Sequence, residues 1–206
     1  MKNQSLRQRY RQELRRIILE SAREAFVQDG YESLSMRSLA KRIGCSHGSI
    51  YLHFKDKEEL FDCLVEESFA QLAEVLAALT PPGKEIDPVE RLKKAGRAYV
   101  EFGLNNPSAY EFAFVLRRPG TSHPQKPHLA YERLQSIVKR CVDEKRIRRI
   151  GVDTASQAIW TAVHGVTSLL IFRPNFPWAD KKKLIAQVVD SAVNGLLAQP
   201  VTLRSR

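Results

Sequence analysis

Side chains that could support nucleophilic or metal chemistry are scattered along this 206-residue chain. The candidates for a nucleophilic site or, with an aspartate, for a metal site are His123, His128, His164, Cys141, Ser168 and Asp153. No H-x-x-x-H pair, no G-x-S-x-G turn and no phosphate-cradling glycine loop accompanies them. We therefore expect no catalytic site, no metal site and no cofactor.

Basic side chains are the more informative group, because the formal net charge is +10. Residues 1–16 hold only one acid, Glu13, against six bases, which are Lys2, Arg7, Arg9, Arg11, Arg15 and Arg16. This balance favours an anionic partner. Two interpretations stay open here, a solvated chain end and a first helix that lies near phosphates. A third is a helix on a membrane surface, whose apolar face would be Leu14, Ile17, Ile18 and Phe26.

The three cysteines, Cys45, Cys63 and Cys141, are odd in number and have no C-x-x-C spacing. This pattern argues against a disulfide framework or a zinc site and indicates a reducing compartment. The sequence shows no apolar signal segment and no run of about 18 apolar residues that could span a membrane. We therefore expect a cytoplasmic protein. Cys45 or Cys63 is expected to be a packing residue, with redox sensing as the alternative.

Apolar spacing and helix-end signals predict four helices at the start of the chain, over about 10–29, 36–43, 46–53 and 56–79. Gly30 suits the left-handed end of the first. Ser35 caps the second, Gly44 ends it, and Ser46 caps the third only two residues later. The second and third form a helix-turn-helix, in which one short helix braces another whose first turn reads base edges in the DNA major groove.

The rest of the chain is also helical in pattern, after a break at Pro81-Pro82-Gly83. Further helices are expected from Asp87-Pro88 and from Asn106-Pro107, and over about 127–146, 153–172 and 178–198, with a loop over 117–127. No stretch alternates with period two, so we predict an all-α fold of about nine helices. A helix-turn-helix domain over 10–70 would precede a ligand-binding and dimerisation domain over 71–200.

A resemblance to a known family covers residues 22–68 without a gap. This stretch resembles the DNA-binding domain of the TetR family of bacterial regulators. The matching positions are Gly30-Tyr31, Ser35-Met36-Arg37, Leu39-Ala40, Gly44, Gly48-Ser49-Ile50-Tyr51, His53-Phe54 and Lys57-Glu58. The resemblance implies a dimeric transcriptional regulator, usually a repressor, that binds double-stranded operator DNA and is released by a small-molecule inducer.

The same resemblance implies roles for individual residues. Phosphate contacts fall to Ser35, Tyr51 and Lys57, with Arg37 and Lys41 as further candidates, and base reading falls to Ser46, His47, Gly48 and Ser49, with His53 nearby. Alternatives are a solvated face for Arg37 and Lys41 and a buried packing role for Tyr51. Cys45 and His47 depart from the commonest family pattern. If His47 contacts DNA, affinity is expected to fall as pH rises from about 6 to about 8.

The second domain is expected to supply a dimer face and a pocket. The last two predicted helices are apolar over wide faces, and the resemblance implies that they pair with a second copy; a monomer's internal core is the alternative. Trp160-x-x-x-His164-Gly165 resembles the WHG class of TetR-family sensor domains. The expected pocket residues, each of which could instead be plain core, are Tyr99, Phe102, Tyr110, Phe112, Phe114, Trp160, His164 and Phe172.

Overall fold

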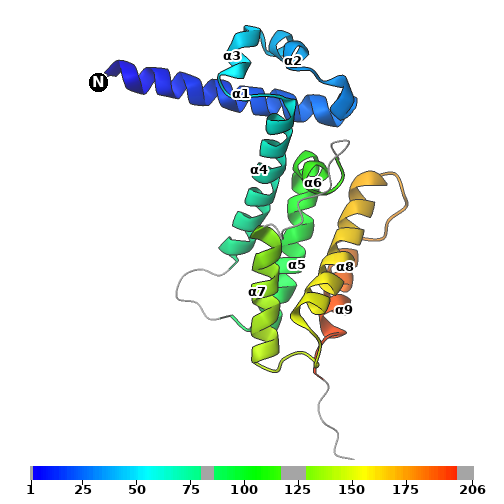
Figure 1. The fold of residues 1–206 in the computed structure, drawn as a ribbon. Coiled ribbons are helices and arrows are strands. Elements are labelled where there is room, and N and C mark those ends of the chain that lie inside the picture. Colours follow the sequence, from blue (N-terminus) through cyan, green and yellow to red (C-terminus); the bar gives the residue numbers. More distant parts are fainter. Residues whose placement is uncertain (1, 80–85, 117–128, 199–206) are drawn as a thin grey trace, which may run out of the picture. The chain divides into compact units, whose positions relative to one another are not determined.

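The computed structural model describes residues 2–79, 86–116 and 129–198. Within these residues the chain forms nine helices and no strand, apart from one antiparallel bridge between Ile147 and Leu197 (Figure 1). The predicted all-α fold is confirmed. The chain divides into two compact units, the first comprising Met1–Ser68 and Ser108–Gln125, the second Phe69–Pro107 and Lys126–Arg206.

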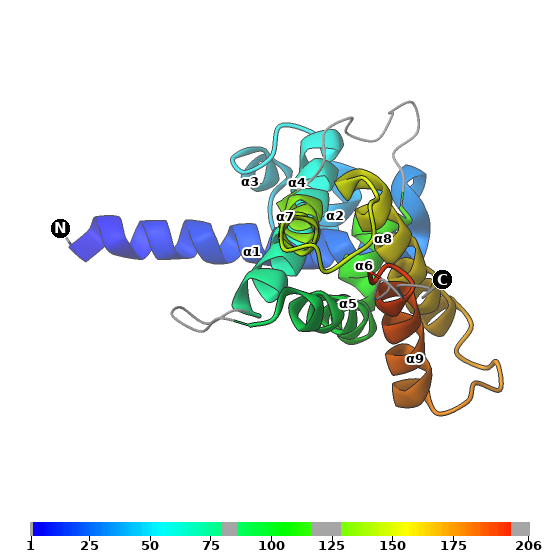
Figure 2. The ribbon, with the colours of Figure 1, turned by 90° about the horizontal axis from the view of Figure 1, so that it is seen from below.

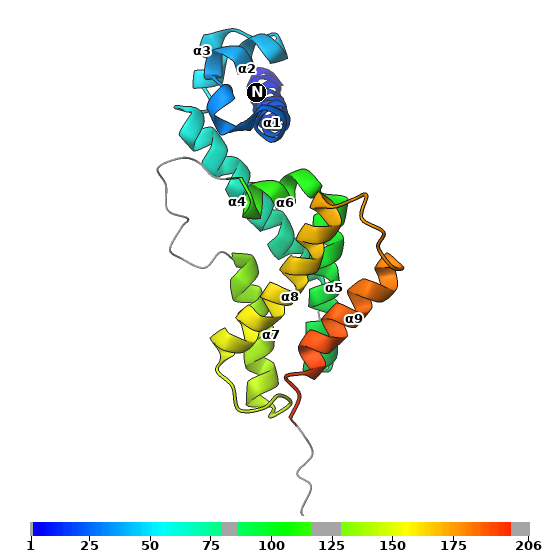
Figure 3. The same cartoon turned by 90° about the vertical axis from the view of Figure 1, so that its right-hand side faces the viewer.

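Five helices contribute to the first unit: α1 (Lys2–Ser33), α2 (Met36–Ile43), α3 (His47–Tyr51), the first half of α4 (Lys57–Ala78) and nearly all of α6 (Pro107–Phe114). Local signals set the helix ends. Ser35 caps α2 by accepting from the Ser38 backbone N–H, and Gly44 ends it in the left-handed conformation at φ 71°. Figure 3, which looks along α1, shows α2 and α3 together on one side of that helix.

The first helix is longer than predicted. It begins at Lys2 rather than near residue 10, and residues 6–13 are all exposed, which is why apolar spacing did not mark this part. At the other end Gly30 adopts φ 80° and ψ 168°. The regular helix is therefore interrupted at Gly30, where its end was predicted, and α1 continues beyond this kink to Ser33.

One apolar core holds the first unit together. Phe26 is fully buried at its centre, and its ring centroid lies 5.3 Å from that of Phe61 and 5.9 Å from that of Phe112. Edge-on aromatic pairs at such distances are favourable. Ile18 is also fully buried in this core. Burial of Ile18 and Phe26 removes the apolar face that a membrane-anchoring helix would need.

The second unit is a helical bundle made of α5 (Pro88–Asn105), α7 (Leu129–Asp143), α8 (Val152–Phe172), α9 (Lys181–Asn194) and the second half of α4. Helix α5 contacts α7, α8 and α9, and Figure 2 shows α5 and α9 side by side. Gly96 permits this approach, because an added Cβ would lie 3.1 Å from Cγ1 of Val189. A larger side chain there would force α5 and α9 apart.

Two helix starts in this unit differ from prediction. Gly151, without a side-chain cap, precedes α8, whereas Asp153 lies in its first turn and accepts from Gln135 Nε2 at 2.7 Å. Helix α9 starts after Asp180, whose carboxylate accepts from the Lys183 N–H, so the helix predicted from about residue 178 is shorter. Several polar residues near a helix start compete for the cap, and spacing alone does not choose among them.

The sequence also predicted a single change of domain near residue 70. The structure places Ser108–Gln125 with the first unit, because Phe112 packs among the aromatic rings of its core. The predicted loop over 117–127, with His123, lies outside the described residues, as does His128.

Candidate nucleic-acid interface and ligand cavity

The first turn of α3 presents a small polar surface. Ser46 caps the helix, since its hydroxyl accepts from the Ser49 N–H at 3.1 Å and lies 2.7 Å from the Ser49 hydroxyl. His47 and Gly48 lie between these two serines and are exposed. Ile50, on the opposite face, is fully buried and anchors the helix. The serines therefore shape the turn, while His47 and the bare backbone at Gly48 face outward.

Gly48 leaves open space in front of α3. An added Cβ would meet nothing closer than the Ser46 hydroxyl at 4.0 Å, and its φ lies outside the left-handed region. The protein's own packing therefore does not require glycine at this position. Close approach of another molecule to the helix backbone is a reason for glycine that the fold itself does not supply.

Tyr51 lies at the end of α3 and is 46% exposed. Its ring packs edge-on against the His47 ring, with centroids 4.8 Å apart. The alternative of a buried packing tyrosine is therefore wrong. The contact holds the phenol beside the first turn of the same helix, where its hydroxyl can donate to an anionic oxygen.

The basic residues near this surface differ in whether they form hydrogen bonds or ion pairs within the chain. Lys57 donates from Nζ to the Tyr31 carbonyl at 3.0 Å and lies 4.2 Å above the Tyr31 ring centroid. This lysine therefore also fastens α4 to the end of α1. Arg37 and Lys41 are exposed, and no carboxylate of the described residues lies within ion-pair distance of either. Arg42, by contrast, is paired with Glu24 at 3.4 Å.

Two further candidate contacts, His53 and Ser35, are constrained by their surroundings. Burial lowers the pKa of His53, and the nearby Arg11 and Arg15 guanidinium groups lower it further. A neutral imidazole is therefore favoured at neutral pH. The Ser35 hydroxyl is exposed but already forms the cap of α2 with Ser38.

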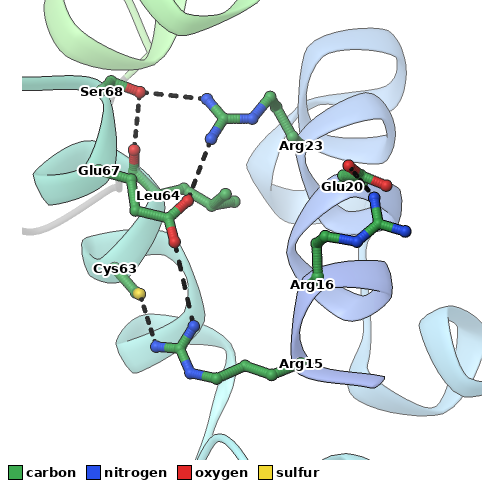
Figure 4. Close-up of polar contacts among 8 residues, drawn as sticks. All are labelled: Arg15, Arg16, Glu20, Arg23, Cys63, Leu64, Glu67 and Ser68. Carbon is green, nitrogen blue, oxygen red and sulfur yellow. Dashed lines mark hydrogen bonds and ion pairs between the residues drawn. The ribbon is translucent and has the colours of Figure 1, made fainter. Parts of the chain in front are cut away.

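A polar brace between α1 and α4, drawn in Figure 4, is the part of the site that sequence reasoning missed. Arg23 donates to the Ser68 hydroxyl at 3.2 Å and pairs with Glu67 at 3.3 Å. Arg15 donates to Cys63 Sγ at 3.1 Å and lies 4.8 Å from the Phe54 ring centroid. No sequence signal pairs residues 44 to 48 positions apart. The brace fixes α4 against α1.

A cavity of about 30 Å³ lies inside the second unit, between α4, α5, α7 and α8. None of the described residues that line it is charged. They are Leu72, Leu76, Ala95, Gly96, Tyr99, Ala130, Tyr131, Leu134, Ile159, Trp160 and Val163. This volume holds only one or two water molecules. A larger ligand would have to displace side chains of the lining.

One hydrogen-bonded group gives this apolar cavity a polar edge. The Tyr99 hydroxyl accepts from Trp160 Nε1 at 3.3 Å and lies 3.0 Å from His164 Nδ1. The imidazole tautomer decides which of these two atoms donates, because the hydroxyl can accept from Nδ1 or donate to it. Burial lowers the pKa of His164, which favours the neutral imidazole.

The aromatic residues predicted to line the pocket are distributed over both units. Tyr99 and Trp160 line the cavity, and His164 is bonded to Tyr99. Phe112 instead packs in the core of the first unit, and Tyr110 pairs with Phe114 on α6 at a centroid distance of 5.0 Å. Phe102 and Phe172 are also not among the lining residues. Small and aliphatic residues, which carry no sequence signal for a pocket, form most of the wall.

Apolar side chains remain exposed on the last two helices and their connection. Leu169 is 50% exposed, Phe172 41% and Phe176 57%. Only part of the apolar stripe of α9 is used inside the chain, since Val189 and Val193 are buried whereas Leu184, Ile185 and Val188 are only partly covered.

Comparisons with known proteins agree with this geometry. Residues 18–64 match the family model described as bacterial regulatory proteins, tetR family, and residues 92–193 match a tetracycline repressor-like C-terminal domain. The HTH-type transcriptional repressor AcnR of Corynebacterium diphtheriae is 48% identical over 63 residues, 31% of this chain and 33% of that protein. The HTH-type transcriptional regulator AcrR of Shigella flexneri is 42% identical over 64 residues, 31% of this chain and 30% of its own length. The chain thus matches about a third of the length of these curated relatives.

Solved structures resemble the chain over nearly its whole length. A Rhodococcus protein of unknown function superposes with a TM-score of 0.75 at 24% identity, covering 90% of this chain and 96% of that one. The fatty acid degradation regulator FadR from Bacillus halodurans gives 0.69 at 17% identity, covering 93% and 97%. These likenesses concern the fold, and the WHG class stays a prediction. Together, the two family matches along the chain show that it belongs to the TetR family of bacterial regulatory proteins.

Proposed function

We propose that this protein is a transcriptional repressor that binds operator DNA as a homodimer and leaves it when a small molecule binds the second unit. The observation that carries the proposal is the first turn of α3, where exposed His47 and Gly48 lie between two capping serines on a helix braced by α2. A rigid helix whose first turn is free of obstruction is what base reading in the major groove requires.

Base reading and phosphate contact fall to different residues in this proposal. His47, with the backbone at Gly48, approaches base edges, and Ser46 and Ser49 keep the turn in place. Tyr51, Arg37 and Lys41 contact phosphates from the two sides of the turn, which fixes the register of α3 on the duplex. Lys57 adds positive charge while it holds Tyr31.

Helix α4 gives a physical route for induction. Its first half is braced to α1 through Arg15 and Arg23, and its second half contributes Leu72 and Leu76 to the cavity wall. A ligand that enlarges the cavity must displace these leucines and with them the helix. A difference of a few kcal/mol in ligand affinity between two α4 positions is enough to change DNA affinity.

The cavity chemistry favours a neutral, mostly apolar inducer. The lining that the structure describes holds no charged side chain, so a charged ligand would lose its hydration without compensation. The Tyr99 hydroxyl, which is bonded to His164, gives the wall a polar group, and this suits a hydroxyl or carbonyl group on the ligand.

We place the protein in the cytoplasm, with the DNA it binds. Helix α8 is long and apolar enough to cross a membrane by length and composition. Its residues Ile159, Val163 and Leu170 are buried in the core of the second unit, which accounts for its apolar character.

The experiment that tests the proposal begins with selection of a preferred duplex from a random library by the purified protein. Titration of that duplex and of a random duplex, at two salt concentrations, should show specific binding of a dimer that weakens with salt. Tyr51→Phe removes only a hydroxyl and should weaken binding to the selected duplex without lowering the free energy of unfolding. Failure to select any sequence would overturn the proposal.

A further inference from the structure

The N-terminal part of α1 extends beyond the region that the family model matches. That match starts at residue 18, whereas α1 starts at Lys2. At 1.5 Å per residue these 16 residues add about 24 Å of helix. Residues 6–13 are all exposed, so no other described part of the chain covers them.

The face of this extension that carries Arg7, Arg11 and Arg15 is continuous with the end of α3. These arginines are four residues apart, so they share one side of the helix. Arg11 donates to the Leu52 carbonyl at 3.2 Å, directly after Tyr51, and Arg15 donates to Cys63 on α4. Figure 4 shows Arg15 directed toward α4. Arg7 lies one turn, about 6 Å, further out on the same face.

The opposite face of the extension is different in charge. Arg9, Glu13, Arg16 and Glu20 share it, and Arg16 is bonded to both glutamates. Along the face of Arg7 there is no such acid, and no carboxylate of the described residues lies within 4.0 Å of the Arg7 guanidinium. One face is therefore neutralised within the helix. On the other face Arg15 lies 4.0 Å from the Glu67 carboxylate of α4, whereas Arg7 and Arg11 keep their positive charge beside α3.

We propose that the Arg7 face of α1 is a second DNA-contacting surface, which binds phosphates of the duplex flanking the half-site read by α3. The last turn of α3 and Tyr51 approach the sugar-phosphate backbone in the proposed complex, and Arg11 joins that end of α3 to the extension. Arg7 then reaches phosphates about two base pairs beyond those near Tyr51. The inference rests on the proposed DNA binding and concerns contacts outside residues 18–64, which the family model matches.

The test compares Arg7→Gln with Arg9→Gln, two equal changes of charge at exposed positions on opposite faces of one helix. The probe is a duplex selected from a random library, titrated from 50 to 300 mM salt. A lost phosphate contact lowers the slope of log affinity against log salt by ~0.9, so the Arg7→Gln dimer should lose ~1.8. Arg9→Gln should keep the wild-type slope, and Arg7→Lys should restore it. Circular dichroism checks that each variant is folded.

A duplex trimmed to the footprint of α3 separates this surface from the reading helix. Arg7→Gln and the wild-type protein should bind the trimmed duplex with equal slope, because the flanking phosphates are gone. Equal slopes for Arg7→Gln and Arg9→Gln on the long duplex would overturn this inference and leave the repressor proposal standing. If no sequence is selected at all, the repressor proposal itself is overturned. In that case a smaller salt slope for Arg7→Gln than for the wild-type protein on random duplex would still support the Arg7 face as a DNA-contacting surface.

A membrane is the other anionic partner that such a face could bind. Vesicles of phosphatidylglycerol, tested at the same salt concentrations, should not bind the wild-type protein more tightly than the duplex does. Vesicle binding that is lost in Arg7→Gln while the duplex slope is unchanged would overturn the assignment to DNA.

Discussion

Substitution of Gly48 can separate an effect on folding from an effect on DNA binding. Its surroundings would accommodate a methyl group, and alanine is the better helix former by about 1 kcal/mol. We expect Gly48→Ala to leave the free energy of unfolding unchanged or to raise it. Affinity for the selected duplex should fall by at least about 10-fold, because the methyl group occupies the space where the groove approaches. Urea unfolding and DNA titration of the same preparation measure both quantities. A stable variant with unaltered affinity would contradict the placement of α3 in the groove.

His164 gives the stability of the protein a dependence on pH. Burial lowers its pKa in the folded state below the ordinary value of 6.5, so the unfolded chain binds a proton more readily. The stabilisation is therefore complete above about pH 6.5 and is lost as the pH falls below it. Urea unfolding at pH 7.5, 6.5 and 5.5 should show this decline.

The His164→Asn variant isolates that contribution. Asparagine keeps an acceptor near the position of Nδ1 for the Tyr99 hydroxyl but does not titrate. The decline in stability below pH 6.5 should become shallower, with a remainder from His53, whose pKa burial also lowers. An identical pH profile in the variant and the wild-type protein would show that folding does not lower the pKa of His164.

At the scale of elements, the brace between α1 and α4 depends on the Arg23 guanidinium. The Arg23 side chain is 18% exposed, and its guanidinium bonds to Ser68 and Glu67 and lies 5.6 Å from the Phe112 ring centroid. We expect Arg23→Met to lower the free energy of unfolding by about 1–3 kcal/mol, because a charge-assisted pair is lost from a half-buried site. Arg16→Met is the matched control, since Arg16 bonds only to exposed glutamates on its own helix. Equal losses in the two variants would contradict a special role for the brace.

How far the sequence predicts these elements depends on whether the cause is local. Ser35, Gly44 and Ser46 act within three or four residues, so the bounds of α2 and α3 could be read from them. The contacts of Arg23 and Phe112 join segments far apart in the chain, and no periodicity encodes them. The bounds of the helix proposed to read bases were therefore predictable, whereas the contacts of the brace and the packing of α6 in the first unit were not.

At the scale of the whole molecule, the cavity likewise depends on contacts between distant segments, which the sequence does not encode locally. Aromatic content selected Tyr99 and Trp160, which line the cavity, but it also selected Phe112, because an aromatic residue suits either core. Leu72, Leu76 and Gly96 were not selected, since nothing distinguishes a leucine or glycine beside a cavity from one in a filled core. Helix α4 became a candidate for coupling only when its two halves were seen to take part in the brace and in the cavity wall.

Dimerisation is the feature that two half-sites of an operator require, and we propose that it uses α8 and α9. Leu169 is half exposed on α8, and we expect a second copy to cover it. Leu169→Glu would place a charge in that apolar contact, which costs several kcal/mol when it has no partner. The variant should sediment as a folded monomer at micromolar concentration, and its affinity for the selected duplex should fall by about 100-fold or more.

Leu129→Glu is the matched control for this prediction. Leu129 is 51% exposed, almost the same as Leu169, but it lies at the start of α7. Since α7 takes no part in the proposed contact, this variant should remain a dimer and bind the duplex as the wild-type protein does. If Leu169→Glu also stays dimeric, or if both substitutions dissociate the protein, the interface lies elsewhere, and the exposed apolar side chains of α8 need another partner.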